Sequence, residues 1–154
     1  MGKTVDIHTP DHYDYAPHPV GDASKLNSIV FSVKAKNDAH IALHQDNGLW
    51  EIVIGGWGNG KSVVRGAAQD CEVGHADHNP LNEHQFHTFW IHWTEHRVEV
   101  GTGAQVGHNV FMSGQSADVR HVKRISVATG FGSSGHWRFP NLEKVNKILE
   151  SVGH

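Results

Sequence analysis

Cysteine is nearly absent from the 154-residue sequence, which has Cys71 alone and therefore cannot form an intrachain disulfide bond. No apolar run approaches the roughly 20 residues that a membrane-spanning helix needs. Residues 1–15, MGKTVDIHTPDHYDY, lack the apolar stretch of a signal peptide. We therefore expect no membrane insertion, and either a cytoplasmic location or secretion by a non-classical route.

Runs of basic residues are also missing. The chain has 13 Lys and Arg against 16 Asp and Glu, so its formal net charge is −3 and a nucleic-acid partner is not expected. Histidine, in contrast, occurs 15 times. Structural zinc sites use thiolates or a defined set of Cys and His, so we interpret the histidines as surface residues and predict no metal or other cofactor. The closely spaced pairs are His75 and His78, His84 and His87, and His92 and His96.

Alternation of apolar and polar residues, which is typical of strands with one buried face, dominates the middle of the chain. In residues 29–37, IVFSVKAKN, the apolar Phe31, Val33 and Ala35 alternate with polar residues. Seven or eight such segments, separated by Gly, Asn and Asp, indicate an all-β protein. We predict an antiparallel, jelly-roll-like β-sandwich, with strands in residues 29–37, 40–45, 49–56, 61–67, 110–113 and 124–132 and a hairpin in residues 87–103.

A helical pattern occurs only after Pro140. In residues 141–152, NLEKVNKILESV, apolar residues recur at spacings of three and four, and Asn141 can cap the first turn. This pattern predicts one C-terminal helix that packs on its own domain. We therefore divide the chain into a partly structured N-terminal arm (1–24), a β-sandwich binding domain (25–139) and a helical segment (140–154).

Residues 55–62, GGWGNGKS, match the phosphate-loop pattern G-x-x-x-x-G-K-[ST]. A phosphate loop requires a following helix whose free N–H groups face the phosphate. The residues after Ser62 include Val63 and Val64 and alternate as in a strand, so we predict a hairpin and no nucleotide binding. Residues 130–135, GFGSSG, match a dinucleotide pattern but lack the helix and acidic residue that it needs.

Two of the five tryptophans differ from the others in their sequence context. Trp57 lies within a loop of Gly and Asn, and Trp137 lies at the edge of the loop that contains GFGSSG. Exposed aromatic faces beside polar side chains suit a ligand with polar and apolar surfaces, such as a sugar ring. No G-x-S-x-G sequence is present, and no nucleophile–base pair can be identified, so the pattern does not indicate catalysis.

Four separated stretches together resemble one family. They are FSVKAKNDAHIAL (31–43), WEIVIGGWGNGKSVVR (50–65), FHTFWIHWTEHRVEVG (86–101) and RISVATGFGSSGHWRF (124–139). Their order and spacing are similar to the domain named after farnesoic acid O-methyltransferase, over about residues 13–139, and this resemblance implies a hairpin at residues 55–62. The family name implies methyl transfer to a sesquiterpene acid, but the all-β pattern lacks the parallel α/β sheet of a typical methyltransferase. Stand-alone copies of this length resemble small lectin-like modules.

We therefore predict a non-catalytic, lectin-like module that binds carbohydrate and uses no cofactor. Two alternatives stay open: a methyltransferase-type enzyme acting on an isoprenoid acid, and a protein-interaction or structural module. Because several weak sites in one assembly raise avidity, we also expect a homo-oligomer, which histidine protonation below about pH 6 should weaken. Loops at strand ends supply the predicted sugar site, which consists of Asp38, His40, Trp57, Asn59, His136 and Trp137. Asp38 would accept hydrogen bonds from sugar hydroxyls or, alternatively, cap the KNDAH turn.

Overall fold

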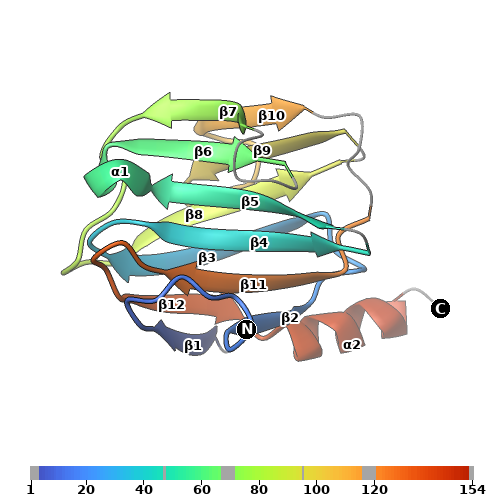
Figure 1. Cartoon of the computed structure of the whole chain (residues 1–154). Coiled ribbons are helices and arrows are strands. Elements are labelled where there is room, and N and C mark those ends of the chain that lie inside the picture. The colour runs from blue at the N-terminus through green and yellow to red at the C-terminus, as the bar shows by residue number, and fades with distance from the viewer. Residues whose placement is uncertain (1–3, 47, 67–71, 95, 116–120, 153–154) are drawn as a thin grey trace.

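The computed structural model describes residues 4–46, 48–66, 72–94, 96–115 and 121–152. Two stacked antiparallel sheets of six strands each form a jelly-roll-like β-sandwich (Figure 1), as the sequence predicts. Sheet 1 has the order β1 (Thr4–Thr9), β12 (Gly135–Pro140), β3 (Ser28–Ala35), β8 (His87–Trp93), β9 (Arg97–Thr102) and β10 (Val110–Gln115). Sheet 2 has the order β2 (Pro19–Asp22), β11 (Arg124–Thr129), β4 (Ala39–Gln45), β5 (Gly48–Gly55), β6 (Lys61–Arg65) and β7 (Glu72–Asp77).

The expected number of seven or eight strands is too low. The segments that form β7 and β12 were not predicted as strands, and the predicted N-terminal arm contributes two strands, β1 and β2, one to each sheet. Pairing stabilises these short segments: β1 is in register with β12 along its whole length, from Thr4 opposite Pro140 to Thr9 opposite Gly135. Such long-range pairing does not show in a local pattern.

The core lies between the sheets and follows from the alternation within each strand. In β3, the residues Ile29, Phe31, Val33 and Ala35 are buried, whereas the residues between them are partly exposed. Phe31 stacks on Phe139 of β12 with ring centroids 5.1 Å apart. In β4 and β5, every second residue likewise faces sheet 1. These core residues are Ala39, Ile41, Leu43, Trp50, Ile52 and Ile54. The residues between them lie on the outer face of sheet 2, which is the face turned away from sheet 1.

Residues 55–62 form a hairpin. β5 and β6 pair in antiparallel register, with Val53 opposite Val63, and the single helical turn α1 (Gly56–Asn59) connects them. A phosphate loop requires a helix directly after its Lys and Ser, whereas residues 61–65 form strand β6. The hairpin prediction is confirmed, and the phosphate-loop interpretation is excluded on geometry.

The C-terminal helix α2 (Leu142–Val152) packs beside β2 (Figure 1). Asn141 caps it, since its side-chain oxygen accepts a hydrogen bond from the Lys144 N–H at 3.2 Å. Leu142 is buried, and the Asn146 side chain donates to the Asp22 carbonyl at 3.0 Å. Neither helix of the described chain has the length and apolar content needed to cross a membrane.

Candidate functional site

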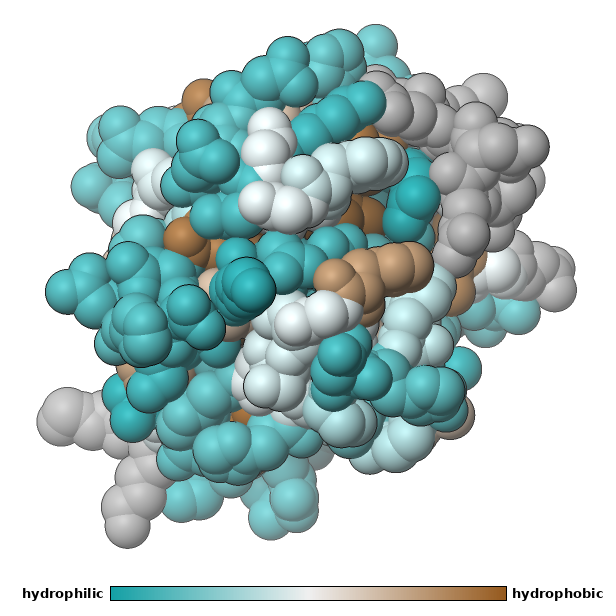
Figure 2. Space-filling view, turned by 60° about the vertical axis from the view of Figure 1, so that its left-hand side comes forward, coloured by the Kyte–Doolittle hydropathy of each residue, from teal (hydrophilic) through white to brown (hydrophobic). Residues whose placement is uncertain are grey.

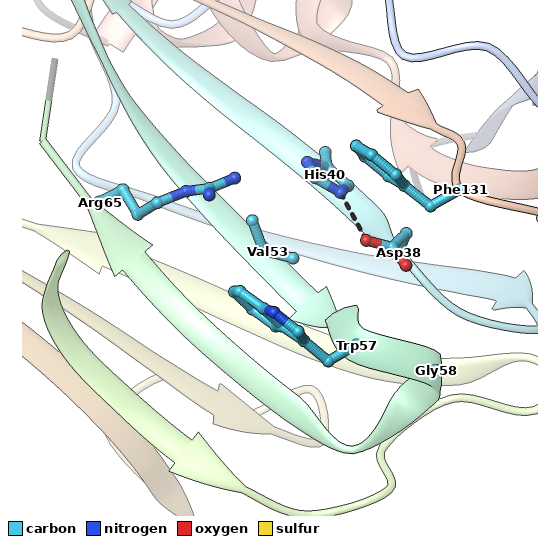
Figure 3. Close-up of a pocket in the computed structure, with 7 residues that line it drawn as sticks. All are labelled: Asp38, His40, Val53, Trp57, Gly58, Arg65 and Phe131. Carbon is cyan, nitrogen blue, oxygen red and sulfur yellow. Dashed lines mark hydrogen bonds and ion pairs between the residues drawn. The ribbon is translucent and has the colours of Figure 1, made fainter. Parts of the chain in front are cut away.

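A pocket of about 320 Å³ opens on the outer face of sheet 2, beside α1. Three strands supply its floor: β4 supplies His40, β5 supplies Val53 and β6 supplies Arg65. These side chains face outward because their neighbours Ile41, Ile52 and Val64 face the core. Figure 3 shows the seven lining residues, which are Asp38, His40, Val53, Trp57, Gly58, Arg65 and Phe131.

Two aromatic side chains stand on opposite sides of this floor (Figure 3). Trp57 of α1 is 61% exposed, and Phe131 in the loop between β11 and β12 is 68% exposed. Both residues have left-handed backbone conformations, with φ of 52° and 53°, which bulky residues rarely adopt. Such conformations persist where the surrounding structure imposes them, and they cluster at ligand sites. Most of the surface seen in Figure 2, which turns the α1 side of the molecule forward, is hydrophilic, with smaller pale and brown patches.

Three lining residues, Asp38, His40 and Arg65, form a row of alternating charge together with Glu51, which lies beneath the floor. His40 Nε2 lies 3.1 Å from Asp38 Oδ1, and His40 Nδ1 lies 3.4 Å from Glu51 Oε2. Arg65 Nη2 donates to the other oxygen of Glu51, Oε1, at 2.6 Å. Because carboxylates accept on both sides of the His40 ring, both of its nitrogens must donate, as in a charged imidazolium.

The N-terminal segment between β1 and β2 covers part of this row. The hydroxyls of Tyr13 and Tyr15 both donate to Glu51 Oε2, the latter at 2.5 Å. The Tyr13 ring also packs against His40, with centroids 4.8 Å apart, and against Phe131 at 5.8 Å. As a result, His40 and Glu51 are each only 2% exposed although they lie on an outer face.

These contacts shift two pKa values in opposite directions. Burial disfavours a charged Glu51, but hydrogen bonds from His40, Tyr13 and Tyr15 outweigh it and lower the pKa of Glu51 from 4.5 to about 2. Burial likewise disfavours a charged His40, but its hydrogen bonds to Asp38 and Glu51 outweigh it and raise the pKa of His40 above 6.5. Both groups are therefore charged in the folded protein near pH 6.

Stability should therefore depend on pH in a specific way. The contribution of Glu51 is complete above its unfolded pKa of 4.5 and is lost as the pH falls toward 2. The contribution of His40 is complete below 6.5 and is lost as the pH rises through its raised pKa. Urea unfolding from pH 2.5 to 9 should show a maximum between about 4.5 and 6.5, and Glu51→Gln should flatten the acid side. An unchanged acid side in that variant would contradict the assignment.

The structure brings together three of the six residues predicted for the site. Asp38, His40 and Trp57 line the pocket. Asn59 lies outside it, because its side-chain amide bonds the backbone of Leu81 in both directions, at 2.9 and 3.0 Å. Its role in the described structure is to fix the loop that contains Leu81.

His136 and Trp137 belong elsewhere, and this corrects the expectation that they sit at a loop edge. β12 begins at Gly135, so both residues are in a strand and point to opposite faces. Trp137 is fully buried in the core and donates to Thr9 Oγ1 at 3.0 Å. His136 lies on the outer face of sheet 1, where it bonds Asp6 Oδ1 at 2.9 Å and stacks on His8.

Five residues of the site were not identified from the sequence: Glu51, Val53, Gly58, Arg65 and Phe131. Glu51 did carry a signal, since it interrupts the apolar segment LWEIVIG, where a buried carboxylate needs partners. Phe131 stands between two glycines and gave no comparable signal. In the described part of the chain, no group of three or more His, Cys, Asp or Glu side chains is placed to hold a metal ion.

The protein is thus a β-sandwich that has an aromatic-rimmed pocket on the outer face of one sheet. Residues 9–143 match the family model described as farnesoic acid O-methyl transferase, and the chain belongs to this family. It is 32% identical over 116 residues to "Uncharacterized protein 5" of Haliotis asinina, covering 70% of this chain and 66% of that one. The chain thus spans just under two thirds of that relative's length.

Solved structures with low sequence identity share the fold. Galectin LEC-6 of Caenorhabditis elegans has a TM-score of 0.53 at 11% identity, over 90% of this chain and 93% of that chain. A prokaryotic β-1,3-1,4-glucanase (lichenase) from a mouse hindgut metagenome has a TM-score of 0.53 at 12% identity, over 90% and 78%. A native glycosidic hydrolase has a TM-score of 0.50 at 12% identity, over 75% of this chain and only 64% of its own.

Proposed function

We propose that the chain is a non-catalytic carbohydrate-binding module and that its site is the pocket between Trp57 and Phe131. The observation that carries this proposal is a pocket in which a few fixed polar groups, Asp38, His40 and Arg65, lie between two exposed aromatic rings. A sugar ring has hydroxyls at its edge and C–H groups on its faces, so it matches both surfaces. The likeness in fold to a galectin and to glucanases supports this ligand class.

The polar groups of the floor suit hydroxyls better than an isoprenoid chain. The carboxylate of Asp38 accepts from His40 and from Asn37 Nδ2 at 2.6 Å, and each of its oxygens has a second lone pair for a ligand hydroxyl. Arg65 lines the other end of the pocket. An isoprenoid tail would cover these charged groups without bonding them, which costs free energy. This argues against the enzyme that the family name implies.

The same contacts argue against sugar cleavage. Glycoside hydrolysis generally uses two carboxyl groups that flank the scissile bond. Among the described residues that line the pocket, Asp38 is the one carboxylate. Glu51 lies beneath the floor, and its oxygens already accept from two tyrosines, His40 and Arg65. Such a carboxylate is a poor nucleophile or proton donor, so we assign it to holding the floor.

Glycan-array screening followed by calorimetry with the best neutral glycan tests the proposal. Trp57→Ala should weaken binding roughly fivefold, because one aromatic contact contributes about 1 kcal/mol. Phe86→Ala is the matched control, since Phe86 is a partly exposed aromatic residue against Lys34 and Arg138, away from this pocket. Equal losses in both variants would contradict the site. Transfer of a methyl group from S-adenosylmethionine to farnesoic acid would favour the enzyme alternative, and absence of both activities would favour an interaction module.

Self-association stays a prediction. Light scattering near pH 7.5 should report a mass of at least twice 17.0 kDa, and a smaller mass below pH 6. A 17.0 kDa species at both pH values would contradict it.

A further inference from the structure

A second pocket, also of about 320 Å³, lies on the other side of the loops that rim the first one. The turn between β3 and β4 supplies Asp38 to the first pocket and Lys36 to the second. The loop between β11 and β12 supplies Phe131 to the first and residues 132–134 to the second. The two loops therefore form one ridge with a pocket on each side.

Hydrogen bonds hold this ridge together. Ser133 Oγ accepts from the Lys36 N–H at 3.1 Å and from the Asn37 N–H at 3.4 Å. The Asn37 side chain donates to the Phe131 carbonyl at 3.2 Å. Ser133 and Asn37 are buried, so these bonds are protected from water. The positions of the two pockets relative to one another are thereby set by contacts inside the protein.

Strand register places basic side chains together on the floor of the second pocket. His136 of β12 is opposite His8 of β1 and also opposite Lys34 of β3. All three lie on the outer face of sheet 1, because their neighbours Trp137 and Val33 are in the core. The two imidazole rings stack with centroids 4.1 Å apart. Lys36 extends this basic surface toward the ridge.

Positive charge in this pocket exceeds negative charge. Neither Lys34 nor Lys36 has a carboxylate within ion-pair distance among the described residues, and the Lys34 ammonium instead lies 4.9 Å from the Phe86 ring centre. Glu83 is the acid that lines the pocket, and its side chain is 54% exposed. Asp6, nearby on β1, already accepts from both His136 and Arg138. Two lysines thus face one solvent-exposed carboxylate.

We propose that this second pocket is an oxyanion subsite, which binds the sulfate or carboxylate group of an acidic saccharide whose neutral part occupies the aromatic-rimmed pocket. Lys34 and Lys36 supply the charge, and the imidazoles and the Ser134 hydroxyl supply hydrogen-bonding groups. Asp38 and Lys36 are two residues apart on the ridge, so a short oligosaccharide can reach both sides. The saccharide part of this inference rests on the proposed function; the anion part does not.

The first experiment measures preference for acidic ligands. On an array of matched neutral, sulfated and uronic-acid glycans, the protein should bind the acidic form of its preferred glycan about fivefold more tightly, the effect of about 1 kcal/mol from exposed charges. Lys34→Met with Lys36→Met should abolish the preference and leave the affinity for the neutral glycan unchanged. The matched control is Lys144→Met with Lys147→Met, which removes two positive charges from α2. It should change neither the preference for the acidic glycan nor the affinity for the neutral one. The proposal of an oxyanion subsite would be wrong if the Lys34 and Lys36 double variant kept the acidic preference. It would also be wrong if the Lys144 and Lys147 double variant lost the preference to the same extent.

The second experiment separates this inference from the proposed function. Inorganic sulfate, titrated at constant ionic strength against chloride, should shift the ring NMR signals of His8 and His136 in the wild type and in Trp57→Ala, but not in the Lys34 and Lys36 double variant. Trp57→Ala should weaken both glycan forms and keep the acidic preference. One outcome distinguishes the two claims: Trp57→Ala leaves acidic-glycan binding intact and the Lys34 and Lys36 double variant abolishes it. That result would support the oxyanion subsite and contradict the sugar site at the aromatic-rimmed pocket. Absence of sulfate shifts would overturn the anion site.

Discussion

Replacing Glu51 by alanine should lower the free energy of unfolding by about 3–5 kcal/mol, the usual cost of removing one member of a buried charge pair. Glu51 is 2% exposed and accepts from Arg65, His40, Tyr13 and Tyr15. Without it, the cations of Arg65 and His40 would lie side by side, and two tyrosine hydroxyls would lose their acceptor. Urea unfolding at pH 6, with the wild type measured in parallel, gives the difference.

Two further variants make this result specific. Glu51→Gln keeps the shape and one acceptor oxygen, so it should cost less than alanine. Glu99→Ala removes a carboxylate on β9 that lies 3.5 Å from His92 and 3.6 Å from Arg97 in partly exposed ion pairs, and it should cost less than about 1 kcal/mol. If Glu51→Ala were no more destabilising than Glu99→Ala, the buried row would not be the element that holds the floor of the pocket.

Replacing Asp38 by alanine should reduce affinity for the preferred glycan tenfold or more. A carboxylate that accepts hydrogen bonds from ligand hydroxyls contributes roughly 1.5–3 kcal/mol. The alternative role of Asp38 is to cap its turn. Its carboxylate, however, accepts hydrogen bonds from the Asn37 and His40 side chains. The contact that fixes the turn is the Asp38 backbone N–H, which donates to the Gly55 carbonyl at 2.8 Å. Alanine keeps that backbone bond, so the turn should persist.

Calorimetry and thermal unfolding of the same Asp38→Ala sample separate the two roles. Asp38 has φ of 53°, which alanine tolerates less well than aspartate, and Asp38→Ala also removes the carboxylate 3.1 Å from the buried His40 ring, so a stability loss of roughly 3–5 kcal/mol is expected. Asp38→Asn tolerates this φ and keeps one acceptor oxygen, and it should bind with intermediate affinity. Unchanged affinity per folded molecule in Asp38→Ala, together with a large loss of stability, would assign Asp38 to the turn.

Local alternation was enough to predict the fold class, because β3 buries every second residue and β5 directs every second residue, Trp50, Ile52 and Ile54, into the core. It failed for β12, although His136, Trp137, Arg138 and Phe139 do alternate, because glycines precede them and the strand depends on pairing with β1 and β3. Trp137 was therefore expected at a loop edge, whereas it lies in the core.

The site could be predicted only in part, for a related reason. Asp38, His40 and Trp57 lie in loops or at strand ends that local patterns mark as turns. Glu51 belongs to the site because Tyr13 and Tyr15, more than 30 residues earlier, lie across the outer face of β4 and β5. Arg65 belongs to it because β6 pairs with β5. Such contacts between distant segments have no periodic signature in the sequence.

The left-handed residues around the pocket have a consequence for the balance between stability and binding. Asp38, Trp57, Asn59 and Phe131 all have positive φ, and each costs roughly 1 kcal/mol relative to glycine at the same position. A chain with glycine at these four positions would lose that strain, and it would also lose both aromatic walls and the carboxylate. Selection for thermal stability alone would therefore replace these four residues by glycine. Selection for ligand binding would keep them, although their left-handed backbone conformations lower stability.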